Sequence, residues 1–147
     1  HTLFPYTTLF RSYLARHGTP QHPDELAAHQ CLAYKGMTGQ QRWFFRLGQD
    51  NWVPYTVKGP LTGNHAETLT QAAELGMGLV MFPSWLIGEA LHKGTLQAVL
   101  SEFHVSTSLE PQQIAALWPT SRRLSVKVRT VIDFFVERFG PTPYWDR

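Results

Sequence analysis

The residues best suited to chemistry lie in one short connection between a predicted strand and a predicted helix. A hydroxyl, a carboxamide and an imidazole stand close together there, at Thr62, Asn64 and His65. The helix that follows begins with backbone N–H groups that lack intrahelical partners, and its dipole adds partial positive charge. Such a helix end attracts anions. Together with Gly63 and Ala66, these residues predict a binding site for a carboxylate or another anion.

Two neighbouring features bear on this site. Asn64 also fits the position that caps the helix, with Glu67 three residues later. Helix capping alone would explain Asn64, although capping and ligand binding are compatible. Phe82 and Pro83 end the next predicted strand. They are candidates for the same site because ligands of an open α/β sheet bind beyond the carboxyl ends of its strands. The alternative for Phe82 is a place in the core.

Other reactive residues do not form a recognisable site. His17, His22 and His29, with Cys31, are the densest group of possible metal ligands, but their spacing matches no zinc pattern. Surface positions exposed to solvent explain these histidines better than a metal site does. Ser84 lacks the Gly-x-Ser-x-Gly surroundings of a nucleophile, and no glycine-rich phosphate loop with a lysine is present. We therefore expect no enzymatic activity, no metal and no cofactor.

The composition is that of a folded domain, or part of one. Of 147 residues, 43% are hydrophobic and 16% are charged, which argues against a disordered chain. The formal net charge of +2 is too small to indicate a nucleic-acid-binding surface. Cys31 is the only cysteine, so an intramolecular disulfide is impossible. No apolar run reaches the roughly 18 residues of a membrane span, and no signal peptide is evident.

The segment around the candidate site has the clearest structural signals. Residues 64–76 predict a helix that ends at Gly76, a residue free to take positive φ. Its apolar face comprises Ala66, Leu69, Ala72 and Ala73. Residues 79–82 form a continuous apolar run closed by Pro83, which is typical of a buried parallel strand.

The remaining segments complete an alternation of strands and helices. We expect strands at residues 31–34, 43–45, 52–57 and 114–118, and helices at residues 24–29 and 85–91. A last helix should begin after Ser125 and end at Gly140, with an apolar face made by Val128, Val131, Ile132, Phe135 and Phe139. This order predicts an α/β fold with a mostly parallel sheet.

The ordered segments resemble the effector-binding domain of LysR-type bacterial transcription regulators. The resemblance is carried by HPDELAAHQCLAY (22–34), WFF (43–45), VKGPLTGNHAETLTQAAELGMGLVMFPSWL (57–86), KGTLQAVL (93–100) and IAALWPTSRRLSVKVRTVIDFFVERF (114–139). No single motif is diagnostic, but the ordered set is specific and covers nearly everything after Ser12. Val126 stands where the family commonly has proline, and valine is tolerated in a first helical turn.

The resemblance implies a fold of the type 2 periplasmic-binding-protein kind, in which two α/β lobes enclose a cleft. Residues 13–23 would connect the lobes, and residues 24–103 would form the second, effector-binding subdomain. Residues 104–139 would supply the strand and helix that return to the first lobe, and residues 140–147 would form a tail. Most of the first lobe would be missing, so the last helix would lack its partner.

The resemblance also implies partners. The chain would bind a small-molecule effector, with a carboxylate as the expected class. It would reach DNA only through an N-terminal helix-turn-helix domain outside this sequence, and so would not bind operator DNA itself. The intact protein would be a cytoplasmic homodimer or homotetramer with no membrane association. In this sequence Val131, Ile132 and Phe135 would be exposed as an apolar patch, favouring association.

Two other functions remain in competition. A lobe of a secreted solute-binding protein would have the same fold; the unpaired Cys31 disfavours it, and a signal peptide upstream would favour it. An enzyme on a related fold would turn over a substrate, but the sequence offers no catalytic constellation for it.

The first residues have a separate explanation. Residues 2–12 read TLFPYTTLFRS, which matches the translation of a common sequencing adapter. We therefore expect residues 1–12 to come from outside the gene, with the native reading frame starting at Tyr13. The alternative is a native leader rich in β-forming residues.

Overall fold

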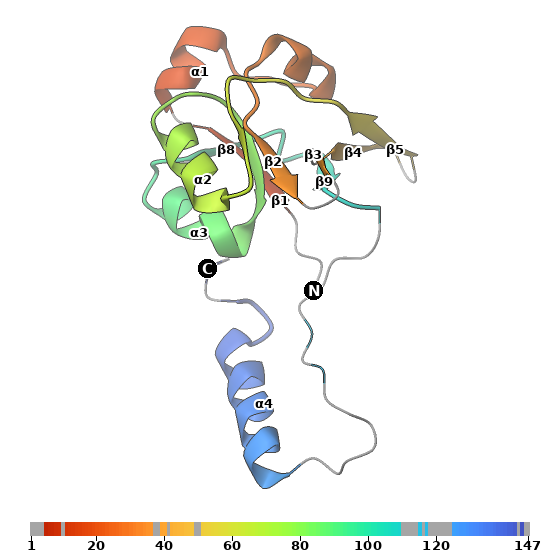
Figure 1. Ribbon diagram of the computed structural model, residues 1–147, viewed down its shortest axis with the longest axis vertical. Coiled ribbons are helices and arrows are strands. Elements are labelled where there is room, and N and C mark those ends of the chain that lie inside the picture. Colours follow the sequence, from red (N-terminus) through yellow and green to blue (C-terminus); the bar gives the residue numbers. More distant parts are fainter. Residues whose placement is uncertain are drawn as a thin grey trace.

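The structure consists of an α/β body and one helix that stands apart from it (Figure 1). The computed structural model describes residues 5–9, 11–36, 39–40, 42–48, 51–109, 115, 117, 125–143 and 145. Within these ranges the strands form three sheets of three strands each.

The first sheet carries the two central helices. β1 (Pro5–Leu9) runs between β7 (Val80–Pro83) and β8 (Gln97–Val99), antiparallel to both. α2 (Ala66–Glu74) and α3 (Ser84–His92) both contact β7 and β1. The predicted helices at residues 64–76 and 85–91 and the predicted strand at 79–82 are confirmed within one or two residues at most ends.

The second sheet leads to the candidate site. β2 (Ala33–Gly36) lies between β3 (Gly39–Gln40), to which it is antiparallel, and β6 (Thr62–Gly63), to which it is parallel. A parallel bridge between Cys31 and Leu79 connects this region with β7. The carboxyl ends of β2 and β6 therefore lie at the same edge of the sheet.

The third sheet covers the other end of the body. β4 (Trp43–Leu47) lies between β5 (Asn51–Tyr55) and β9 (His104–Ser106) and is antiparallel to both. α1 (Arg11–His17) and the 3-10 helix η1 (Pro23–Ala28) come before β2 in the chain. Although β9 follows the expected boundary at residue 103, it pairs with β4 of the body.

The prediction of a mostly parallel sheet is wrong for the described residues. Parallel pairing is confined there to β2 with β6 and to the Cys31–Leu79 bridge, and the other strand pairs are antiparallel. For β2 with β3 and for β4 with β5 the cause is a short connection, because strands joined by a hairpin pair antiparallel and a parallel pair needs a long crossover. Helix α2 provides such a crossover only between β6 and β7.

β7 divides the core into two clusters. Leu79 and Met81 pack into one cluster, whereas Val80 and Phe82 pack into the other, beneath α2 and α3. This alternation follows from the two-residue period of a strand. The apolar face of α2 meets the second cluster through Leu69, Ala72 and Ala73, which are buried, while Ala66 is half-buried. The predicted core faces of this helix and strand are therefore confirmed.

Cys31 lies in the first cluster. Its side chain is fully buried, and burial raises the pKa of the thiol to about 12. A thiol reacts as the thiolate, so the folded structure keeps Cys31 unreactive.

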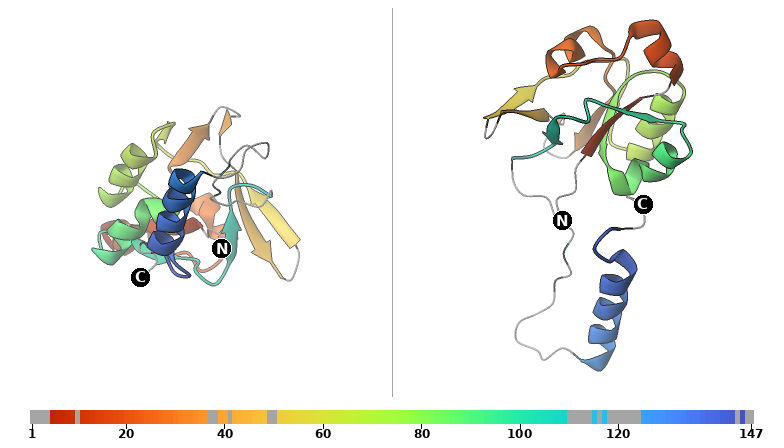
Figure 2. Two further views of the ribbon diagram at one scale, coloured as in Figure 1. Left: turned by 90° about the horizontal axis from the view of Figure 1, so that it is seen from below. Right: turned by 180° about the vertical axis from the view of Figure 1, so that it is seen from behind.

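The last helix, α4 (Val126–Phe139), is confirmed with its predicted caps. The Val128 N–H donates to Ser125 Oγ at 3.4 Å, and Gly140 has a φ of 59°. No residue of α4 is buried, and Val131 and Phe135 are 54% and 48% exposed. Figures 1 and 2 show α4 projecting from the body. Near its C-terminal end, the Phe139 ring meets Trp145, whose backbone lies against Gly88 of α3.

The expected strand at residues 114–118 falls largely outside the described residues. Ala115 and Leu117, which are described, belong to no strand and are exposed. Among the described residues, none of the helices has the length and apolar character needed to cross a membrane.

The exposed face of α4 predicts self-association. Val131→Glu with Phe135→Glu should shift the chain toward monomer, because charge opposes burial of this face between copies. Light scattering after size exclusion measures the change. Val126→Glu is the matched control, since Val126 is 82% exposed and lies off the predicted face. A monodisperse monomer for the unmodified chain would show that α4 drives no association.

Candidate functional site

A surface depression marks the edge where β2 and β6 end. It has a volume of about 520 Å³ and is lined by Tyr34, Lys35, Gly36, Gly63 and Asn64. The two strands are parallel, with Tyr34 opposite Gly63, which brings these segments to one edge. Gly63 and Asn64 were predicted site residues, whereas the contribution of β2 was not.

Lys35 gives this depression its charge. It is exposed on β2 and, like Asn64, lines the depression. An ammonium group and an amide N–H are donors that suit a carboxylate. The sequence offered one clue to Lys35. Residues 31–34 were predicted to be a strand, and a site beyond the carboxyl ends of strands would involve the residues that follow it.

The cap of α2 is His65, and the prediction of Asn64 is wrong. His65 Nδ1 accepts a hydrogen bond from the Thr68 N–H at 3.3 Å and lies 3.0 Å from Thr68 Oγ1. The predicted capping box fails for the same reason: the helix begins at Ala66, one residue later than an Asn64 cap requires. Asn64 is exposed and lines the depression.

The other predicted site residues lie around the depression rather than in its lining. Thr62 and His65 are exposed, and Ala66, the first residue of α2, is half-buried. Phe82 is 5% exposed and packs in the second core cluster. Its ring meets the Tyr34 ring edge-on, with 6.2 Å between centroids, so it supports a residue of the lining.

Pro83 has a different position. It is half-buried and occupies the N-cap of α3, where it makes no side-chain capping hydrogen bond.

A second depression carries the opposite charge. It lies between α2 and α3, has a volume of about 240 Å³, and is lined by Glu67, Thr70, Gln71, Glu74, Leu86, Glu89, Ala90 and Lys93. The Lys93 ammonium pairs with Glu89, and its hydrogen bond lowers the pKa of that carboxyl. Three carboxylates against one ammonium group make this groove unfavourable for an anion.

The histidines expected at the surface differ in their environments. His17 is exposed and His22 half-buried, but His29 is buried, so the expectation is wrong for His29. It packs against the buried Tyr13 of α1, a contact that sequence spacing could not show.

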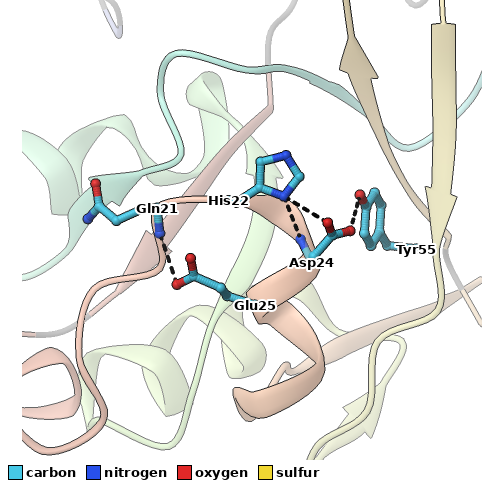
Figure 3. Close-up of polar contacts among 5 residues, drawn as sticks. All are labelled: Gln21, His22, Asp24, Glu25 and Tyr55. Atoms are coloured by element: carbon cyan, nitrogen blue, oxygen red, sulfur yellow. Dashed lines mark hydrogen bonds and ion pairs between the residues drawn. The ribbon is translucent and has the colours of Figure 1, made fainter.

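His22 takes part in the polar cluster that begins η1 (Figure 3). Its Nδ1 accepts from the Asp24 N–H at 3.3 Å and lies 3.0 Å from Asp24 Oδ2. The Tyr55 hydroxyl donates to Asp24 Oδ1 at 2.8 Å, and the Gln21 N–H donates to Glu25 at 3.2 Å. Burial, together with the hydrogen bond to Asp24, raises the pKa of Tyr55 to about 12. The cluster thereby joins β5 to η1.

Most of the sequence matches the model of a known protein family. Residues 9–140 match the LysR substrate binding domain. The chain belongs to this family. It is 31% identical over 128 residues to the HTH-type transcriptional regulator CrgA of Neisseria meningitidis serogroup B, an alignment that covers 87% of this chain and 41% of CrgA.

Solved structures agree with the family. The CrgA regulatory domain from Neisseria meningitidis aligns with a TM-score of 0.67 and 27% identity, covering 95% of this chain and 68% of that structure. The AphB regulatory domain from Vibrio vulnificus, treated with cumene hydroperoxide, has a TM-score of 0.72 at 18% identity, covering 93% and 67%. This second likeness concerns the fold alone. Together they confirm the expected type 2 periplasmic-binding-protein-like α/β class.

The LysR relationship favours the regulator over the solute-binding protein. CrgA is named as a transcriptional regulator, and so are further relatives at similar identity. The chain spans about two fifths of the length of the curated relatives it matches, 41% for CrgA.

The corrected cap of α2 gives a stability prediction. His65→Ala should cost about 1 kcal/mol in the free energy of unfolding, because the Thr68 N–H loses its acceptor. His65→Asn should retain most of the stability, since asparagine is a good N-cap. Asn64→Ala, the control, should change stability by less than about 0.5 kcal/mol. Urea denaturation measures all three, and a larger loss for Asn64→Ala than for His65→Ala would restore Asn64 as the cap.

Proposed function

We propose that this LysR-family chain is the effector-sensing part of a bacterial transcription regulator and binds a carboxylate at the edge where β2 and β6 end. The observation that carries the ligand class is the depression lined by Lys35, Gly63 and Asn64, because it combines a cation with amide donors. The N-terminus of α2, beside this edge, adds positive potential. Thr62, His65 and Ala66 complete the rim, and Phe82 supports it through its ring contact with Tyr34. Pro83, which follows Phe82 at the end of β7, stays a proposed site residue.

The same proposal covers the intact protein. Its N-terminal helix-turn-helix domain binds DNA, and the protein acts as a cytoplasmic homodimer or homotetramer. Effector binding shifts a pre-existing equilibrium between subunit arrangements, because the effector has different affinities for them. Residues 24–103 form the effector-binding lobe, residues 13–23 connect the lobes, and residues 104–139 return to the first lobe. The chain itself has no catalytic role.

Binding of simple carboxylates tests the ligand class. Succinate and benzoate should bind more tightly than the uncharged succinamide and benzamide in isothermal titration calorimetry. Lys35→Met should weaken carboxylate binding by about tenfold, since it removes a charged hydrogen-bond donor. Lys93→Met is the matched control, because this exposed lysine lies in the acidic groove. Equal weakening by both substitutions, or no preference for the acids over the amides, would remove the carboxylate assignment.

The coding sequence upstream of Tyr13 tests the regulator assignment independently. Long-read sequencing of the source DNA should reveal a helix-turn-helix domain, a linker helix and another α/β lobe. A signal peptide leading directly into an α/β lobe would instead identify a solute-binding protein. The same reads would show whether TLFPYTTLFRS is encoded in the native gene.

A further inference from the structure

A buried tyrosine fastens α1 to the start of the second sheet. Tyr13 is 1% exposed, and its hydroxyl oxygen accepts a hydrogen bond from the Gln30 N–H at 2.7 Å. The same hydroxyl lies 3.3 Å from His29 Nδ1. Because Gln30 is the donor in the first bond, the hydroxyl hydrogen of Tyr13 is free to point at His29. With the Tyr13 hydroxyl as the donor, this second bond requires an unprotonated Nδ1 on His29.

The surroundings of His29 oppose a positive charge. His29 is 9% exposed, and the His17 ring stacks on Tyr13 with 4.4 Å between centroids. Burial lowers the pKa of His29 most, and positive charge on His17 lowers it further, whereas the Glu25 carboxylate of η1 acts in the opposite direction. Neutral His29 is therefore the form that fits the folded structure.

Two other titratable or charged groups lie near Tyr13, and one of them, the Cys31 thiol, also lies 3.9 Å from the His29 carbonyl oxygen. Arg16 of α1 and the Cys31 thiol influence the Tyr13 hydroxyl, whose pKa is raised, chiefly by burial. Cys31 is fully buried and stays neutral, since the pKa of its thiol is about 12. The Arg16 guanidinium donates to the Gly76 carbonyl at 3.3 Å. Acidification thus acts on this cluster through the His29 imidazole, whose pKa is lowered.

We propose that Tyr13 and His29 form an acid-sensitive latch, in which protonation of His29 at Nδ1 removes the acceptor of the Tyr13 hydroxyl and releases α1 from the sheet. The proton comes from solvent and no covalent bond changes. Release of α1 also removes the Arg16–Gly76 hydrogen bond at the end of α2. None of the residues of this latch lines the depression at the ends of β2 and β6, and the proposal does not rest on the proposed effector site.

The direction of the pH effect follows from linkage. The pKa of His29 is lowered below its ordinary value of 6.5 in the folded state, so the released state binds the proton more readily. The contribution of the latch is complete above pH 6.5 and is lost as pH falls from 6.5 toward the folded-state pKa. Within that window, the equilibrium constant for release should rise with falling pH, by at most about tenfold per pH unit because one proton is bound.

Hydrogen–deuterium exchange of the full chain tests this behaviour. Protection of α1 amides, corrected for intrinsic exchange rates, should fall as the pH drops below 6.5 in the unmodified protein. His29→Gln should abolish this pH dependence, because a neutral side-chain oxygen accepts the Tyr13 hydrogen bond at every pH. His92→Gln is the matched control: His92 is an exposed histidine at the end of α3, and this variant should keep the wild-type profile.

An NMR titration of the unmodified chain gives a result that needs no variant. The His29 ring should titrate below pH 6.5, and the Gln30 amide signal should shift with the same midpoint. If His29→Gln fails to fold, this titration decides. The latch is overturned if His29 titrates at or above 6.5, if α1 protection in the unmodified chain is independent of pH, or if folded His29→Gln keeps the wild-type pH dependence.

Discussion

Residues 30–33, which we call the seam, form backbone hydrogen bonds to chain segments on both sides, and the rest of the body depends on them. On one side, Gln30 and Leu32 exchange hydrogen bonds with Leu79, at 2.8 and 2.7 Å. On the other side, the N–H groups of Cys31 and Ala33 donate to Lys58 and Leu61, at 2.8 and 3.1 Å. One short segment therefore satisfies its buried polar groups in two directions, which a buried backbone requires. Both core clusters and the edge that carries the depression are positioned from this seam.

The seam is possible only because two glycines approach it. A Cβ on Gly59 would lie 2.2 Å from the Cys31 carbonyl oxygen, and one on Gly78 would lie 2.4 Å from that of Gln30. Gly78 also has a φ of 158°, a value that residues with a side chain rarely adopt. The two glycines let the backbones meet at hydrogen-bonding distance, and larger residues would push them apart.

The apolar periodicity of the sequence and its glycine and proline residues predicted the local helices and strands, but not which strands pair. The apolar face of α2 and the run from Leu79 to Phe82 identify a helix and a buried strand because those signals are local. Strand pairing is non-local, so the antiparallel pairs and the burial of His29 could not be read from spacing. The lining of the depression was foreseen only in part: Gly63 and Asn64 lie in the stretch before α2, whereas Lys35 joins them only because β2 pairs with β6. The α2 cap was misplaced by one residue because Asn64 and His65 both offer a suitable acceptor.

The fully buried Cys31 gives the seam an intrinsic reporter. Its sulfur is separated from solvent by the same packing and backbone pairing that hold β7 against residues 30–33. A thiol reagent reaches it only when this region opens, and it then meets an ordinary cysteine freed from its apolar surroundings. The rate of modification therefore measures how often the centre of the body opens locally, because Cys31 is the one cysteine among these 147 residues.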